Sequence, residues 1–253
     1  MEYIVAADSD IGTSKKINQD SICIKTARTG SDSAALMLVC DGMGGLSKGE
    51  AASAAVVNSF SEWFNNRLAD EFDSWDMIRH DVLDTLQRLN SKIIAYGQKN
   101  HFQLGTTATG MIIINSQYMI FHVGDTRLYK ISYQLNRLTE DHTFITRELK
   151  RGTITSKQAE SDPRRNALTQ CIGVTGEMTP DIKFGTIESG ANYMICSDGF
   201  RHVLSDAEIL ENLSPRIVTT KTAMKIKMRS LIETVKERGE KDNISAAMFR
   251  AEF

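Results

Sequence analysis

The spacing of apolar residues changes along this chain, and that change limits the folds it can adopt. Over 75–97 they recur every three or four positions, which predicts an amphipathic helix. The apolar side of this helix would consist of Ile78, Val82, Leu86, Leu89, Ile93 and Tyr96. Residues 34–40 are apolar throughout and end at Asp41-Gly42, as expected of a buried strand stopped by a turn. The chain must therefore combine helices with sheets.

The predicted elements come in blocks rather than in strict alternation. Strands are predicted over 2–7, 21–27, 34–40, 105–115, 117–124, 127–132, 182–187, 192–197 and 244–250. Helices are predicted over 48–68, 75–97, 206–213 and 219–238. Short turns between the three strands from 105 to 132 predict an antiparallel meander. Clustered strands and paired helices favour an α+β fold over βαβ winding.

Composition excludes several classes of protein. The 253 residues contain 30 Lys and Arg against 32 Asp and Glu, a balance that argues against binding to nucleic acid through phosphate charge. Apolar runs reach only about seven residues, far below the ~20 of a membrane span, and no leader is recognisable. We expect one domain, 1–253, without a membrane or nucleic-acid partner. The four cysteines form no C-x-x-C pair, so we expect reduced thiols and a cytoplasmic location.

Carboxylates stand where predicted strands begin or end. These residues are Asp20, Asp41, Asp125, Asp198 and Asp242. Each alone suits a turn or a cap. Together, without a matching set of His or Cys, they predict an oxygen-only site for a hard cation such as Mg²⁺ or Mn²⁺. One carboxylate can bridge two such cations, which lower the pKa of a shared water. Gly42 fits this site because it has no side chain to keep its carbonyl from a metal.

Short motifs continue this pattern along the chain. They are GTSKKINQD at 12–20, DGMGG at 41–45, GEAA at 49–52, GTTA at 105–108, VGDTR at 123–127, LTEDH at 138–142, RGTIT at 151–155, PRRN at 163–166, CSDG at 196–199 and KDN at 241–243. In this order they resemble the motifs of metal-dependent protein Ser/Thr phosphatases of type 2C, the PPM family, in their bacterial single-domain form. The resemblance implies a four-layer α-β-β-α sandwich, with two antiparallel sheets flanked by helix pairs. It also implies that the polar, turn-rich residues 143–167 form a flap beside the active site.

The resemblance assigns a role to each candidate residue. Asp41 would bridge two metal ions, and Gly42 would add a backbone oxygen. Asp198 and Asp242 would hold the first ion, and Asp20 would reach the second. Asp125 would join Asp198 in holding a weaker third. The implied cofactors are two Mn²⁺ or Mg²⁺ ions, with that weaker third ion.

The motifs depart from the family pattern at three places. Lys15 stands where the family has a phosphate-binding Arg, and Lys lacks the planar fork that grips two oxygens. Met43 and Leu46 occupy positions where many members have a His that would protonate the leaving oxygen. Phe200-Arg201-His202 follows Asp198-Gly199, where Leu-Thr and a polar residue are usual. His202 is either a replacement proton donor or a partly exposed helical side chain.

The activity implied by the resemblance is hydrolysis of phosphoserine and phosphothreonine in proteins. A hydroxide shared by two metal ions would attack phosphorus in one step. Asp41, Asp198 and Lys15 would be the catalytic residues, and Lys15 would bind the substrate phosphate. Implied partners are Ser/Thr-phosphorylated proteins and a cognate kinase in bacterial signalling, and we expect a monomer. Two alternatives stay open, a catalytically weak phosphatase-like regulatory binding module and a metal-dependent hydrolase of small phosphoesters or nucleotides.

Overall fold

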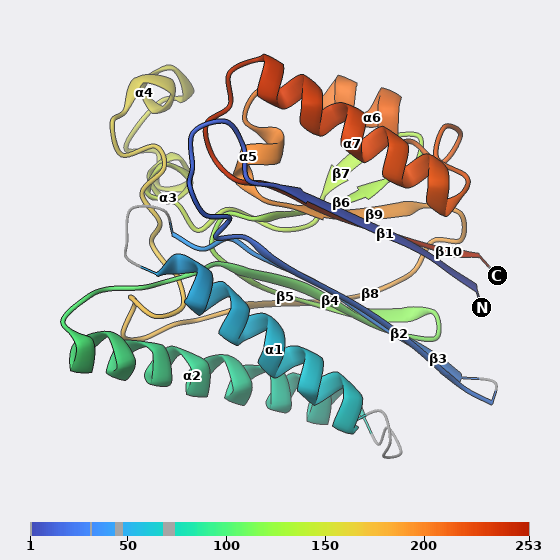
Figure 1. Ribbon diagram of the computed structural model, residues 1–253, viewed down its shortest axis with the longest axis horizontal. Coiled ribbons are helices and arrows are strands. Elements are labelled where there is room, and N and C mark those ends of the chain that lie inside the picture. The colour runs from blue at the N-terminus through green and yellow to red at the C-terminus, as the bar shows by residue number, and fades with distance from the viewer. Residues whose placement is uncertain (1, 31, 44–47, 68–73, 253) are drawn as a thin grey trace.

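The computed structural model describes residues 2–30, 32–43, 48–67 and 74–252 (Figure 1). Within them, two antiparallel sheets of five strands each lie face to face. The first sheet has the order β1 (Glu2–Asp10), β10 (Ile244–Glu252), β9 (Asn192–Cys196), β6 (Arg127–Ile131) and β7 (Leu135–Arg137). The second has the order β2 (Ser21–Thr29), β3 (Asp32–Cys40), β4 (Ala108–Ile114), β5 (Gln117–Val123) and β8 (Asp181–Thr186).

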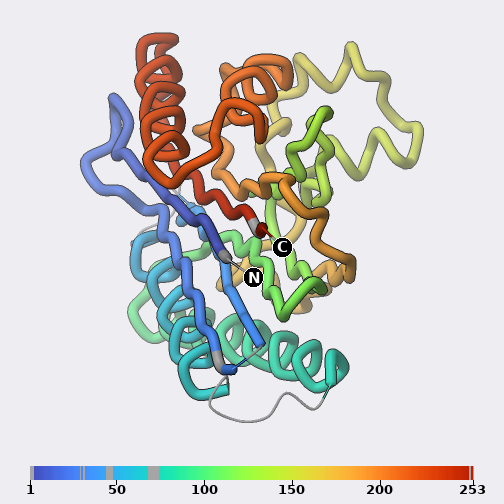
Figure 2. Tube along the Cα trace, turned by 90° about the vertical axis from the view of Figure 1, so that its right-hand side faces the viewer, coloured from blue at the N-terminus to red at the C-terminus, as the bar shows by residue number. Residues whose placement is uncertain are grey.

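Helix pairs cover the outer face of each sheet. The helices are α1 (Gly49–Arg67), α2 (Trp75–Asn100), α3 (Phe144–Arg151), α4 (Ser156–Ser161), α5 (Asp198–Arg201), α6 (Asp206–Leu213) and α7 (Lys221–Glu237). Helices α1 and α2 pack on the second sheet, and α6 and α7 pack on the first (Figure 2). The predicted four-layer α-β-β-α sandwich is therefore confirmed. None of the helices in the described ranges is long and apolar enough to cross a membrane.

Strand β3 explains why residues 34–40 are apolar throughout. Successive side chains of a strand point to opposite faces of the sheet. Leu36 and Leu38 pack against α1 and α2, whereas Met37 and Val39 pack between the two sheets. Both faces of this strand are buried, so alternation with polar residues is absent.

The predicted meander over 105–132 is wrong. Strands β4 and β5 pair as expected, but β6 pairs with β9 and β7 in the other sheet. The chain changes sheets at Gly124, whose φ of +110° is a conformation that favours glycine. Residues 188–191, between the strands predicted over 182–187 and 192–197, also join two sheets, because β8 and β9 belong to different ones. The local spacing of apolar residues reveals a strand but not the strand with which it pairs. These two crossovers could therefore not be predicted from the sequence.

Smaller differences concern the ends of elements. Helix α2 buries Ile78, Val82, Leu86, Leu89 and Ile93 as predicted, but Tyr96 is 50% exposed. Gly97 is buried instead, because the backbone at Phe102 approaches it too closely for any side chain. Helix α5 and the three-residue strand β7 were not predicted, since neither is long enough to show a period.

Candidate active site

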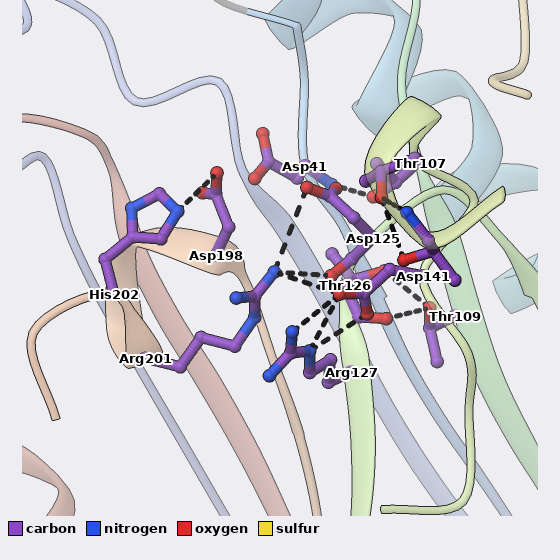
Figure 3. Close-up of polar contacts among 12 residues, drawn as sticks. Asp41, Thr107, Thr109, Asp125, Thr126, Arg127, Asp141, Asp198, Arg201 and His202 are labelled. Atoms are coloured by element: carbon purple, nitrogen blue, oxygen red, sulfur yellow. Dashed lines mark hydrogen bonds and ion pairs between the residues drawn. The ribbon is translucent and has the colours of Figure 1, made fainter. Parts of the chain in front are cut away.

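The strand register brings the predicted carboxylates to one end of the sandwich. Ser21, which follows Asp20, pairs with Cys40, which precedes Asp41. In the other sheet Cys196, two residues before Asp198, pairs with both Ala246 and Arg127. Asp125 lies in the crossover before Arg127, and Asp242 lies just before β10. Figure 3 shows Asp41, Asp125 and Asp198 grouped around one region, with Arg201 beside them.

Asp41 is held by the loop that precedes β4. Its backbone N–H donates to Thr107 Oγ1 at 2.9 Å, and its carbonyl accepts from Thr106 Oγ1 at 2.9 Å. Gly42 bonds through its N–H to the carbonyl of Gln19 at 3.1 Å. A Cβ at Gly42 would lie 2.4 Å from that carbonyl oxygen, so the close approach of the two chain segments requires glycine.

Asn243 ties the loop that carries Lys15 to the start of β10. Its side-chain amide donates to the carbonyls of Ile11 and Ile17 at 2.9 and 3.2 Å. Its Oδ1 accepts from the backbone N–H of Gln19 at 2.9 Å. The side chain is buried, so these bonds exchange little with water. They place Asp20 and Lys15 beside Asp242, and sequence reasoning gave Asn243 no such role.

Burial and mutual repulsion disfavour the ionised form of these carboxyls. The pKa of Asp41 lies well above its ordinary value, first through burial and then through the charges of the other four Asp residues. Burial, and next the charge of Asp198, raise the pKa of Asp125 to about 7, although Arg201 and Arg127 oppose this. Burial likewise raises the pKa of Asp20 to about 7. Like charges gathered in this way favour a bound cation.

Orphaned oxygens give the clearest sign of what these residues fit. Within the described part of the chain, neither carboxylate oxygen of Asp20 accepts a hydrogen bond, and neither does Asp198 Oδ1, although all three atoms are buried. The hydroxyls of Ser245 and Ser197 lower the pKa of Asp20 in part, but without hydrogen bonds of normal geometry. Buried carboxylate oxygens without donors suit a hard divalent cation. Within the described ranges, no three His, Cys, Asp or Glu side chains lie close enough to hold a metal ion without moving.

Lys15 contacts a predicted metal ligand. Its Nζ lies 2.8 Å from Oδ1 of Asp242, with the two side chains 28% and 40% exposed. Burial alone would lower the pKa of Lys15, but the hydrogen bond and charge of Asp242 raise it above the ordinary value. The neighbouring Lys16 is exposed. Lys15 is therefore a cation held at the edge of the carboxylate group.

Arg201 lies against Asp125, which sequence reasoning missed. Its Nη2 lies 3.2 Å from the carbonyl oxygen of Asp125 and 3.9 Å from Oδ2 of the same residue (Figure 3). The same nitrogen lies 3.9 Å from Oδ2 of Asp141. The Asp141 carboxylate also accepts two hydrogen bonds from Arg127, from Nη2 to Oδ2 at 2.6 Å and from Nε to Oδ1 at 2.9 Å. Helix α5 starts at Asp198, so Arg201 is one turn along it. The sequence carries no signal for this contact, because α5 is too short to show a period and Asp125 lies 76 positions away.

His202 contacts two carboxylates rather than projecting freely into solvent. Its Nε2 lies 3.3 Å from Oδ2 of Asp198, and its Nδ1 lies 3.3 Å from Oε2 of Glu240. Met43 bonds through its backbone N–H to the carbonyl of Gly105. Leu46, like Gly44 and Gly45 of the same motif, lies outside the described residues.

Comparison with known proteins decides the family. The model of the family described as protein phosphatase 2C matches residues 12–247. The chain belongs to the protein phosphatase 2C family. It is a phosphoprotein phosphatase, a hydrolase, by that membership. The metal dependence expected of the protein phosphatase 2C family agrees with the oxygen-only donor set described above.

Individual relatives agree with this assignment. The chain is 31% identical over 245 residues to the protein phosphatase PhpP of Streptococcus pneumoniae, covering 95% of this chain and 94% of the relative. It is 29% identical over 224 residues to the serine/threonine phosphatase stp of Listeria monocytogenes, covering 86% and 84%. The structure of the S. agalactiae serine/threonine phosphatase superposes with a TM-score of 0.86 at 30% identity, over 99% of this chain and all of the other.

Proposed function

We propose that this chain removes phosphate from phosphoserine and phosphothreonine in proteins, using two Mn²⁺ or Mg²⁺ ions and a weaker third. The observation that carries the proposal is the pair of buried, donorless oxygens of Asp20 beside Asp41 and Asp198. Burying carboxylate oxygens without partners costs free energy, and a site that binds no cation would not recover that cost. The names of the relatives, serine/threonine phosphatases among them, support the same substrate class.

Five carboxylates and one carbonyl would hold the ions. Asp41 would bridge two of them with the carbonyl of Gly42, Asp198 and Asp242 would hold the first, and Asp20 would reach the second. Asp125 would share the weaker third ion with Asp198. Divalent cations bound there supply a water of lowered pKa and positive charge opposite the phosphoryl oxygens.

The protein's own groups orient the substrate. Lys15 lies at the edge of the carboxylate group, where its ammonium contacts Asp242. Once a metal ion occupies Asp242, Lys15 would give its charge to a phosphoryl oxygen. The hydrogen bonds of Thr106 and Thr107 keep Asp41 from shifting when the charge at phosphorus changes. Preorganised charges of this kind are a large part of enzymatic rate enhancement.

The flap, defined as residues 143–167, would form part of a single domain that spans 1–253. It contains α3 and α4 and projects at the end of the sandwich that carries the carboxylates (Figure 1). Its place beside Asp125 supports a role in contacting protein substrates.

The four buried, unpaired cysteines support a location in a reducing cytoplasm. A cognate kinase and its targets would be the partners, with the enzyme acting as a monomer.

Metal removal tests the proposal. The chelated protein should lose hydrolysis of aryl phosphate and of phosphoserine peptides, and Mn²⁺ or Mg²⁺ should restore both, whereas Zn²⁺ alone should not. Asp41→Asn and Asp242→Asn should each lower kcat by at least about 10²-fold, as the loss of a key electrostatic group does. Asp84→Asn, on the surface of α2 and paired with Arg88, is the matched control and should keep full activity.

Each contrary outcome has a distinct meaning. Full activity in the stripped protein would refute metal dependence. Binding of phosphopeptides without turnover would favour the regulatory binding module. Turnover of aryl phosphate with none of phosphopeptides would favour a hydrolase of small phosphoesters.

A further inference from the structure

A cavity of about 960 Å³ lies between the flap and the loop that follows α7. Flap residues, among them Thr143, Leu149 and Arg165, line one part of it, and Val203 with 239–241 lines another part. Asp125 and Arg201 line the cavity too, so it adjoins the carboxylate group. A peptide whose phosphate reaches the carboxylate group could therefore place neighbouring residues here.

The cavity is lined by more cations than anions. Six Lys or Arg residues line it, against four Asp or Glu residues. The chain as a whole has a formal net charge of −2, so this positive excess is local. Charge of one sign in a concave site attracts ligands of the opposite sign.

Every carboxylate of the cavity already has partners. Arg127 and Arg201 contact Asp141 and Asp125 as described, and Lys150 pairs with Glu140 at 2.6 Å. Glu240 accepts from the backbone N–H groups of 241 and 242 at 2.7 and 2.9 Å, and it contacts His202. Within the described residues, none of the four pairs with Arg165 or Lys241 of the same cavity.

Two cations of the cavity have no side-chain partner among the described residues. Arg165, on the flap, and Lys241, in the loop after α7, are exposed, and neither side chain makes an ion pair or hydrogen bond within the described part of the chain. Lys241 directly precedes Asp242, a candidate metal ligand. A carboxylate that reached either cation would break no existing pair.

We propose that this cavity binds acidic side chains that flank the phosphoserine or phosphothreonine of a substrate, through Arg165 and Lys241. The inference rests on the proposed function and names its preferred substrates, phosphoproteins with acidic sequence around the phosphorylated residue. A second phosphate on a neighbouring residue offers the same negative charge. We assign the ligand to flanking carboxylates rather than to a second phosphate. Arg165 and Lys241 are two separate cations, and each can contact one carboxylate of an acidic flanking sequence.

Matched phosphopeptides test the subsite. Three peptides would carry one phosphothreonine and differ only in flanks of Asp, Asn or Lys, and a fourth would carry two phosphates. With Mn²⁺ present, the wild type should show a kcat/KM about tenfold higher for the Asp peptide than for the Asn peptide, through a lower KM. Added salt should reduce this ratio, because the contacts are exposed.

Charge reversal supplies the variant arm. Arg165→Glu/Lys241→Glu should prefer the Lys-flanked peptide to the Asp-flanked one, a reversal that general damage to the fold would not produce. Lys225→Ala, an exposed cation on α7 away from the cavity, should keep the wild-type ratio.

The outcomes separate the subsite from the proposed function. Equal kcat/KM for Asp and Asn peptides, with metal-dependent turnover of both, would overturn the subsite and leave the function standing. Preference for the doubly phosphorylated peptide alone would overturn the assignment to carboxylates. Absence of turnover on every phosphopeptide would refute the proposed function itself.

Discussion

Lys15 Nζ lies 2.8 Å from Asp242 Oδ1, so the predicted phosphate anchor is paired with a predicted metal ligand. The two residues are 227 positions apart, and Asn243 brings them together by binding the loop around Ile17. A cation that bound Asp242 would compete with the ammonium for the same oxygen. Lys15 would then be free to contact phosphate, which links metal loading to substrate binding.

Replacing Lys15 should weaken substrate binding more than turnover. A charge-assisted hydrogen bond contributes about 1.5–3 kcal/mol, so Lys15→Ala should lower kcat/KM roughly 10- to 100-fold, mainly through KM. Lys15→Arg should match or exceed the wild type, because its fork can contact two oxygens. Lys16→Ala is the control. Steady-state kinetics that found Lys16 essential and Lys15 dispensable would contradict the assignment.

Asp125→Ala should leave two tightly bound cations while lowering turnover. Asp125 belongs to the crossover between sheets and is not among the ligands proposed for the two inner ions. Calorimetric titration with Mn²⁺ should find two tight sites and no weak third one. Loss of all metal binding would show that Asp125 belongs to the inner pair.

Arg201→Ser should strengthen the weak outer cation site. The guanidinium lies 3.9 Å from the Asp125 carboxylate and repels any cation that approaches it. We expect tightening of about tenfold, equivalent to ~1.4 kcal/mol. Arg238→Ser, a cation that pairs with Glu208 away from the site, serves as the control. Unchanged or weaker titration of the third ion in Arg201→Ser would argue against this competition.

His122 should make stability depend on pH. It is buried between Thr109 Oγ1 at 2.7 Å and the carbonyl of Glu140 at 2.9 Å. Burial, and next the charge of His142, lower its pKa to about 4, from an ordinary value near 6.5. The folded state therefore binds this proton more weakly than the unfolded state, so stability is complete above pH ~6.5 and falls toward pH ~4. The loss should reach about 3 kcal/mol.

Urea unfolding of the wild type and His122→Gln at several pH values measures this loss. The free energy of unfolding of the variant should lack this part of the decline. The difference in unfolding free energy between the two proteins should therefore shrink as the pH falls from 6.5 to 4. The raised pKa values of Asp20 and Asp125 act in the opposite direction, but they are common to both proteins and cancel in the comparison. A pH-independent difference would contradict the argument.

Gly42→Ala should destabilise the protein as well as impair the site. The added Cβ would lie 2.4 Å from the carbonyl oxygen of Gln19 and 2.6 Å from the carbonyl carbon of Gly49, and both are backbone atoms. Overpacking of this kind typically costs about 1–3 kcal/mol. Gly176→Ala, where a Cβ would meet nothing within 4 Å, is the control. Equal unfolding midpoints for the two variants would mean that the backbone at Gly42 yields easily.

The sequence alone determined most of the local structure. Helices α2 and α7 and strand β3 could be predicted because burial leaves a period in the residues themselves, 3.6 in a helix and continuous apolarity in a strand buried on both faces. Asp residues at strand ends, in motifs of known order, indicated both the family and the residues of the candidate site. None of this requires knowledge of which strands are neighbours.

The tertiary structure decided what those residues contact. The crossover at Gly124 sends β6 to the other sheet and sets Asp125 between the sheets, whereas local spacing suggested a meander. Arg201 reaches Asp125 only because β9 and β6 are paired, and Lys15 meets Asp242 only through the bonds of Asn243. Such contacts join positions that are far apart in the chain. Their energies depend on distance and burial in the folded state, and neither leaves a period in the sequence.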